Sequence, residues 1–529
     1  MKSKMLTAVV KKEVLHQVMS SRFITVTLIM FVLSLLAALV GTEDYSRRSR
    51  NYRTHLEHSA QELERTHVYS FLQPVVVRKP EPLSVLDRGF EARLGEEIRI
   101  EVSAVPTAAN GGSPGNDFIA GSPDFDLTMI VQLVLGLLAL LLTFDAVVGE
   151  KEAGTLKLVL ANDVSRATIV VGKFLGACIA LLMPLLVGTA LTLGVLAVRA
   201  GVVLDALRWQ RLGGLVAVYM LYLCLMALIG LLISVWARST SSSLVLSLLT
   251  WLAVVFLIPQ TAGALAGDIE SADRARQTMR EDVRRLEQER GARLRELSVL
   301  DPRAAKEKLG DYAPVTLGKN WAERRRYGTA VFYDRLARYY RQSIGVSRHY
   351  ADRIFEVRWR YRLQQRRAQQ RAERLFWLSP AFLMERVAES LAGTSSGDYD
   401  EHLAASRAYR TQLIRYLEGR EAFSSWRWFT DDPPSPIPWT SLLGLTPEDV
   451  DATNVQGLIE RFLSKEIQQI VAEQQDRYDR DPLRLLALDD LPPFEDRHPE
   501  LPRASRRILP ELSLLVLMSL ALAAATFGR

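Results

Sequence analysis

The chain contains very little cysteine for its length of 529 residues: Cys178 and Cys224 are the only two. Both lie inside apolar runs, so no disulfide framework can hold the polar parts of the chain together. A cysteine-free exterior is compatible with an oxidising compartment, although cysteine content alone does not identify one.

The sequence also lacks a Gly-x-x-x-x-Gly-Lys-Ser/Thr stretch, the loop that holds nucleotide phosphates in many ATPases. Any ATP hydrolysis must therefore come from another polypeptide. We expect no catalytic residues and no cofactor in this chain; ATP and Mg²⁺ would be bound by a partner.

Sequence patterns of metal sites, such as His-Glu-x-x-His and Cys-x-x-Cys, are absent. His55 and His58, three residues apart, would share one face of a helix. His67 would point to roughly the opposite face of the same helix at about 100° per residue. We interpret all three as exposed helix histidines rather than as a metal site.

Long apolar runs dominate the rest of the chain, which is 48% hydrophobic. Each is about long enough to cross roughly 30 Å of hydrocarbon as a helix, and almost none carries internal charge, which a buried helix of a soluble core would show on its outer face. We therefore predict six membrane spans: Phe23–Val40, Leu127–Val148, Phe174–Val198, Leu212–Val235, Leu244–Ala262 and Leu509–Phe527. The first could instead be a secretory signal, but its length and its amphipathic leading segment favour an uncleaved span.

The middle of each predicted span holds no Asp, Glu, Lys or Arg. Ion-coupled transporters and intramembrane proteases keep ionisable groups at this depth, so their absence argues against both classes. Asp124 and Asp126 stand before the second span, where a membrane enzyme could use paired acids, but we expect them to cap that helix.

Basic residues indicate which side of the membrane each segment occupies. They precede the first span and recur between the second and third, so the positive-inside bias places both segments in the cytoplasm. Residues 41–126, 199–211 and 263–508 then lie outside, and 236–243 inside. Arg47, Arg48 and Arg50 and a second basic cluster at 503–507 oppose this orientation, but long translocated loops largely escape the charge rule.

The two long outer segments read as mainly helical domains. Residues 41–126 start helical, contain a short strand in "EEIRIEVSAVP" and end in a flexible "NGGSPGN". In 263–508, a helical run is expected near Asp268–Leu300, where a short antiparallel helix pair is favoured over a long coiled coil, and a second helical stretch near Trp321–Trp377. A proline-rich strap at 430–439 and a helix near Thr446–Tyr478 follow. Basic and acidic residues are nearly balanced here, so no nucleic-acid partner is expected.

Residues 147–173 interrupt two apolar runs with a compact amphipathic stretch. Gly149 and Gly154 permit sharp turns, and apolar residues follow from Thr155 to Leu160. Asn162, Asp163 and Ser165 are N-cap types, which predicts a helix starting near Val164 and running into the third span. This order favours a rigid cytoplasmic lever over a plain polar loop.

These residues carry a resemblance to the signature of ABC-2 type exporter permeases. The similar positions are Phe144, Asp145, Gly149, Glu150, Glu152, Gly154, Thr155, Leu156, Ser165, Arg166, Gly172 and Lys173. The N-terminal "MLTAVVKKEVLHQVMSSRF" is similar to the amphipathic interfacial helix that opens that family.

The resemblance implies an α-helical polytopic membrane protein with six spans, as in type V ABC exporters. Two permease copies, identical or paralogous, would surround a translocation path, with cytoplasmic ABC ATPase subunits docked on the lever. The residues implied to couple to the ATPase are Asp145, Gly149, Glu150, Glu152, Gly154, Thr155, Leu156, Arg166 and Lys173. Glu150→Ala or Arg166→Ala is expected to uncouple ATP hydrolysis from function.

The segment 263–508 departs from minimal family members, which have a short loop there. It resembles the insert of a bacterial subgroup, through "LSPAFLMERVAESLAGTS" at 378–395 and "SRAYRTQLIRYL". This implies the bacterial inner membrane but no substrate. The expected division is 1–22 interfacial helix, 23–40 first span, 41–126 first outer domain, 127–148 second span, 149–173 coupling region, 174–262 third to fifth spans, 263–508 second outer domain and 509–529 last span.

Two functions fit this sequence. One is export of a hydrophobic or amphipathic cargo, such as a lipid, a peptide or a lipoprotein-like molecule. The other is a non-transporting membrane subunit that passes movement from ATP hydrolysis to an envelope protein. Both require contact with membrane lipids, and both use the same lever.

Overall fold

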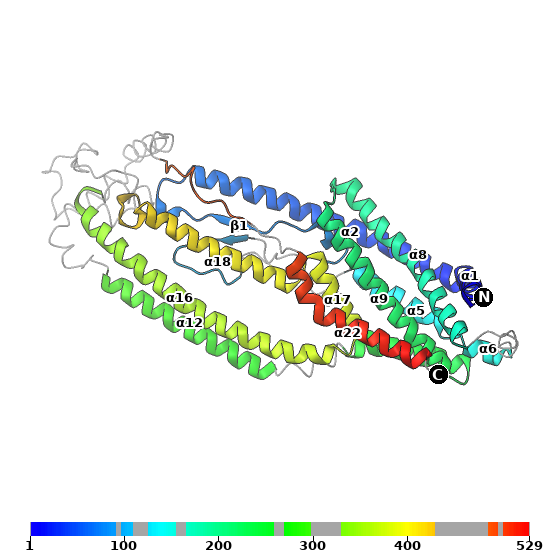
Figure 1. Cartoon of the computed structure of the whole chain (residues 1–529). Coiled ribbons are helices and arrows are strands. Elements are labelled where there is room, and N and C mark those ends of the chain that lie inside the picture. Colours follow the sequence, from blue (N-terminus) through cyan, green and yellow to red (C-terminus); the bar gives the residue numbers. More distant parts are fainter. Residues whose placement is uncertain are drawn as a thin grey trace, which may run out of the picture.

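The computed structural model describes residues 2–90, 97–108, 125–154, 166–258, 269–297, 329–428, 485–495 and 501–527. The molecule is elongated, with a bundle of apolar helices at one end and a second body of helices at the other (Figure 1). We call the second body the far domain and the opposite tip, where α6 (Val148–Glu152) lies, the α6 end.

The bundle contains the six predicted spans, and in the described part of the chain six helices are long and apolar enough to cross a membrane. They are α2 (Ser21–Glu64), the run α4 (Leu127–Ile130), η3 (Val131–Leu135) and α5 (Gly136–Thr143), α8 (Arg166–Ala200), α9 (Ala206–Trp236), α10 (Thr240–Leu252) with η4 (Ala253–Leu257), and α22 (Leu501–Phe527). The prediction of six apolar spans in a mainly helical protein is confirmed.

The first span belongs to a much longer helix. Ser20 caps α2, since its side-chain oxygen accepts a hydrogen bond from the Phe23 N–H at 3.2 Å. The 44 residues of α2 extend about 66 Å at 1.5 Å per residue. One helix therefore connects the bundle to the far domain without a break (Figure 1).

Two spans contain a π-helical turn, η3 in the second and η4 in the fifth. Such turns leave carbonyl groups without their usual helical partners. In each case a side chain from another element donates a hydrogen bond to one: Tyr222 Oη to Gln132 O at 3.0 Å and Ser379 Oγ to Val254 O at 2.7 Å. These bonds attach the second span to α9 and the fifth to the start of α17 (Pro380–Ala392).

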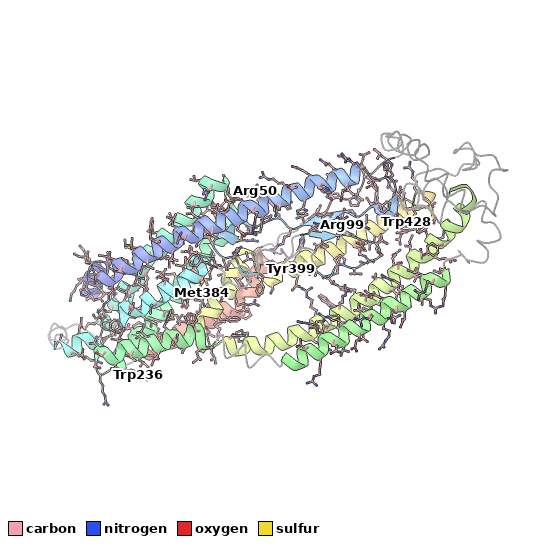
Figure 2. All side chains as sticks on the ribbon, turned by 180° about the vertical axis from the view of Figure 1, so that it is seen from behind. Arg50, Arg99, Trp236, Met384, Tyr399 and Trp428 are labelled. Atoms are coloured by element: carbon pink, nitrogen blue, oxygen red, sulfur yellow. The ribbon has the colours of Figure 1, made fainter. Side chains whose placement is uncertain are left out.

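Helix α17 packs inside the bundle, although it lies within the segment 263–508 that the sequence predicts to be an outer domain. Its Leu383 is fully buried against Leu225 of α9 and Leu515 of α22. Figure 2 shows Met384 of α17 among the bundle helices, seen from behind. At 13 residues, about 20 Å, this helix is too short to be recognised as a span by its length.

Both long polar segments contribute to one far domain. Strands β1 (Val75–Val77) and β2 (Glu97–Arg99) pair antiparallel, with Val76 opposite Ile98. They share a hydrophobic core with α18 (Ser396–Gly419), through residues such as Tyr399 and Leu403. Short turns η1 (Tyr69–Phe71), η2 (Pro82–Val85), η5 (Ala422–Ser424) and η6 (Trp426–Trp428) complete the element order.

A helical hairpin lies along the far domain. Helix α12 (Ile269–Leu297) runs beside α16 (Thr329–Phe376) (Figure 1). Val283 and Leu286 pack against Tyr350 and Ile354. A helix pair is therefore present at this position, formed by α12 and α16.

Some of the features expected from sequence lie outside the residues that the structure describes, and one expectation is wrong. The strap at 430–439, the helix near Thr446–Tyr478, "NGGSPGN" and the caps at 162–165 lie outside the described residues. Helix α2 ends at Glu64, so the expectation that His67 shares a helix with His55 and His58 is wrong. Asp126 does cap α4, accepting from the Met129 N–H at 2.8 Å, as expected.

Candidate functional site

The helix of the second span is interrupted by a turn between α5 and α6, at Phe144–Val147. A break leaves N–H and C=O groups without helical partners, and two serines from other spans satisfy them. Ser234 Oγ of α9 accepts hydrogen bonds from the N–H groups of Val147 and Val148, at 3.0 and 3.1 Å. Ser243 Oγ of α10 donates to the carbonyl of Phe144 at 2.6 Å.

Three consecutive charged residues of α6 contact three different helices. Glu150 pairs with Lys173 of α8 at 2.9 Å. Lys151 Nζ donates to the carbonyl of Val235, near the end of α9, at 2.7 Å. Glu152 accepts hydrogen bonds from the backbone N–H and the hydroxyl of Thr240, the first residue of α10. We call Glu150, Lys151, Glu152, Ser234 and Ser243 the α6 hub.

Lys173 extends these contacts to the N-terminal helix α1 (Lys2–Val18). Its Nζ lies 3.5 Å from a carboxylate oxygen of Glu13 on α1, as well as 2.9 Å from Glu150. The Lys173 side chain is only 8% exposed and that of Glu13 12%. Removing one partner of such a buried ion pair leaves an uncompensated charge, so the three side chains hold α1, α6 and α8 together.

Two glycines of α8 bring α1 into close contact. A Cβ built at Gly172 would lie 2.6 Å from Val9 Cγ1, and one at Gly176 would lie 2.8 Å from Glu13 Cβ. Their four-residue spacing is the small-xxx-small pattern that lets two helix backbones approach. The ion pair to Lys173 therefore forms beside a tight helix contact.

Asp145, in the break itself, makes a more exposed ion pair. Its carboxylate accepts from Arg22 Nη1 of α2 at 2.9 Å. The Arg22 guanidinium also lies 5.1 Å from the ring centre of Phe144. Exposed pairs of this kind contribute little to stability, so the contact orients the break more than it holds it.

The two glycines of the predicted lever differ from each other. Gly154 follows α6 with φ of +70°, the left-handed region that favours glycine. Gly149 lies inside α6, where an added Cβ would meet only Asp145 Cβ at 3.7 Å. The expected turn is therefore present at Gly154, whereas Gly149 is an ordinary helical residue.

Comparison with known proteins identifies the family. The model of the ABC-2 family transporter proteins matches residues 7–414, from α1 to within α18. The chain belongs to the ABC-2 family of transporter proteins.

Among curated proteins, this ABC-2 family chain is similar to two described as "Probable ABC transporter permease protein NosY". It is 44% identical over 62 residues to the one from Pseudomonas aeruginosa, covering 12% of the chain and 22% of that relative. It is 40% identical over 86 residues to the one from Stutzerimonas stutzeri, covering 16% of the chain and 30% of that relative. The chain thus aligns with less than a third of the length of either relative.

The structure gathers most of the nine predicted coupling residues at one site. Gly149, Glu150 and Glu152 lie in α6, with Gly154 after it, Asp145 before it and Lys173 against it. Thr155 and Leu156 lie outside the described residues, and of Arg166 only the backbone position at the start of α8 is described. Their role in coupling to an ATPase stays a prediction.

Sequence reasoning missed the partners that complete this site in the ABC-2 chain. They are Glu13, Arg22, Ser234, Thr240 and Ser243. A weak signal existed, since serines and a threonine cluster where the fourth and fifth apolar runs meet. Within the described ranges no group of three or more His, Cys, Asp or Glu is placed to hold a metal ion.

Proposed function

We propose that this chain is the permease subunit of an ATP-driven ABC exporter, and that a separate cytoplasmic ATPase acts on it through the α6 hub. One observation carries the proposal: three consecutive charged residues of a five-residue helix each bind a different membrane helix. The family match supports the permease role.

The contacts make α6 suited to transmitting a push. A short helix joined to its neighbours by one flexible turn would absorb movement locally. Here the backbone break is bonded to Ser234 and Ser243, and the side chains reach the ends of α8, α9 and α10. Because packed elements shift as rigid bodies rather than deform continuously, a displaced α6 would move these three helix ends together.

The cargo proposed is hydrophobic or amphipathic. Helix α10 exposes a broad apolar face and has no charged residue. Its exposed apolar side chains are Val245, Leu246, Leu248, Leu249 and Leu252. Such a face suits contact with lipid, with an apolar cargo or with a second permease copy, and it offers no ionisable group to an ion.

The proposed orientation puts the α6 end in the cytoplasm of a bacterial inner membrane and the far domain outside. The far domain would receive or gate the cargo, because it is bonded to the ends of the bundle. Arg208 of α9 pairs with the buried Glu81 at 2.7 Å, and Arg78 donates to the carbonyl of Gly393 after α17 at 2.7 Å.

The experiment is to purify the native complex through a tag on this chain and to measure ATP hydrolysis in lipid nanodiscs. The test variant is Glu150→Gln/Lys173→Met, which removes the ion pair while keeping side-chain volume. The matched control is Arg293→Met/Glu296→Gln, which removes an exposed pair on α12. We expect an ATPase to copurify in all three cases, with hydrolysis dependent on the permease in wild type and control but not in the test variant.

Two results would count against the proposal. If no ATPase copurifies with the wild-type chain, the ABC permease role fails. If hydrolysis in the test variant matches that of the control, the hub is not the coupling point. Mass spectrometry of molecules released from liposomes on ATP addition then addresses cargo; hydrolysis that responds only to an added envelope protein, with nothing moved, would replace export by the non-transporting function.

A further inference from the structure

The two cysteines of the chain lie against each other inside the bundle. Cys178 on α8 and Cys224 on α9 have their sulfur atoms 3.1 Å apart, and both are free thiols. Cys178 is buried, whereas Cys224 is partly exposed on the bundle surface. Because the sequence contains no third cysteine, neither thiol has another partner within the chain.

The spacing is close to that of a bond. A disulfide needs about 2.05 Å between sulfurs, so the two atoms must approach by about 1 Å. Ala180 on α8 and Ala227 on α9 are fully buried in one hydrophobic core, and small residues allow helices to lie close together. Closing this distance requires side-chain rotation with a slight helix shift.

The depth of the pair limits what can oxidise it. Cys178 lies twelve residues after the start of α8 and Cys224 twelve residues before the end of α9, about 18 Å along each helix. Charged thiols and oxidants reach this depth poorly, whereas small uncharged reagents can enter the bundle, where Cys224 is partly exposed. A two-electron oxidant dissolved in the bilayer can reach it.

We propose that Cys178 and Cys224 form a reversible disulfide that fixes α8 to α9. The two S–H bonds break, one S–S bond forms, and the two electrons and two protons pass to a lipid-soluble quinone, which becomes the hydroquinone. Lys173, which binds Glu150 of the hub, lies five residues before Cys178 on the same helix. The bond therefore prevents α8 from moving against α9 during turnover, a consequence that rests on the proposed function.

The chemical test uses the purified complex in nanodiscs, treated with an alkyl benzoquinone and then with dithiothreitol. We expect the intact mass of the chain to fall by two hydrogen atoms, peptide mapping to link the two cysteine peptides, and the reductant to reverse both. A quinone adduct on either sulfur, or two thiols that stay free to maleimide after unfolding, would overturn the proposal.

The functional test compares ATP hydrolysis of the oxidised and reduced complex with that of the Cys178→Ser/Cys224→Ser variant. We expect a severalfold loss on oxidation in wild type, full recovery on reduction and no response in the variant. A fully formed disulfide with unchanged hydrolysis would overturn the proposed effect on movement. If the α6 hub is not the coupling point, Glu150→Gln/Lys173→Met and its control hydrolyse ATP equally, whether the two cysteines are oxidised or reduced. The two proposals therefore fail by different measurements.

Discussion

At Asp87, burial and the neighbouring carboxylates both disfavour the ionised form of the side chain. Its side chain is almost fully buried in the loop that follows η2. Burial raises the pKa of this carboxyl well above its ordinary value, and the nearby Asp126, Glu389 and Glu385 raise the pKa further, while a hydrogen bond with Thr128 lowers it. Asp87 is therefore protonated in the folded protein over a pH range in which the unfolded chain has lost that proton.

The sign of the pH dependence follows. Above about pH 4, where an unfolded Asp ionises, the folded state holds the extra proton, so the free energy of unfolding falls as pH rises towards the folded pKa. Asp87→Asn removes this loss. We predict that the variant melts at a higher temperature than wild type at pH 7–8 and that the difference vanishes near pH 4, measured by thermal unfolding in detergent.

Asp44 is the matched control, because its pKa is shifted in the opposite direction from that of Asp87. Burial alone would raise the pKa of Asp44, but the charges of Arg48, Arg88 and Arg47 outweigh burial and hold the pKa below its ordinary value. Its stabilisation is present above about pH 4 and is lost as pH falls through the folded pKa. Asp44→Asn should therefore destabilise at neutral pH; a stabilising effect there, or a destabilising one for Asp87→Asn, would refute these assignments.

Among the elements, the contact between α1 and α8 depends on a glycine. We predict that Gly176→Leu displaces α1, because even a Cβ would lie 2.8 Å from Glu13 Cβ. Limited proteolysis should then cleave residues 1–20 at least several times faster than in wild type. Gly194→Leu, on the same helix with nothing within 4 Å of an added Cβ, should leave the cleavage rate unchanged; equal protection of both variants would rule out the tight contact.

The end of α6 gives a second prediction at this scale. Gly154→Val places a branched side chain at φ of +70°, which costs about 1–3 kcal/mol for non-glycine residues. We expect a reduced yield of assembled complex on size-exclusion chromatography. Gly149→Ala, at a helical position with room for a methyl group, should assemble normally, and an unaffected Gly154→Val yield would show that the turn is not needed.

The elements also show where sequence reasoning succeeds and where it stops. Hydropathy alone located the six spans, because long apolar runs leave few alternatives in a chain of this kind. It could not show the π-helical turns in the second and fifth spans, nor that α17 enters the bundle. Those features depend on contacts with distant residues such as Tyr222 and Leu515, and no local pattern encodes them.

The same limit applies to the candidate site. The family-like residues pointed to α6, but no local pattern shows that Glu150 and Glu152 bind helices of their own chain. Glu13 and Lys173 are 160 residues apart, and their pairing follows from the close approach of α1 at Gly172 and Gly176. Spacing along a chain predicts a shared helix face, not a contact between two spans.

At the scale of the whole molecule, one long helix and two side-chain contacts connect the bundle with the far domain. The contacts are the ion pair of Arg208 with Glu81 and the hydrogen bond from Arg78 to the carbonyl of Gly393. Helix α2 reaches from the bundle into the far domain, whose core combines residues from both long polar segments. Figure 2 shows Trp236 near the α6 end and Trp428 at the other extreme. We propose that movement delivered by an ATPase at α6 reaches the far domain along this route, so the docking of an ATPase at α6 is the claim on which the rest depends.

Photo-crosslinking in cells tests this claim most directly. A benzophenone amino acid is placed at Ala153, exposed at the end of α6, and, as control, at Val203, which is 90% exposed at the opposite end of the bundle. We predict that Ala153 crosslinks to a protein with a phosphate-binding ATPase loop, identified by mass spectrometry, and that Val203 does not. An ATPase captured from Val203, or none captured from Ala153 in a complex that contains one, would contradict it.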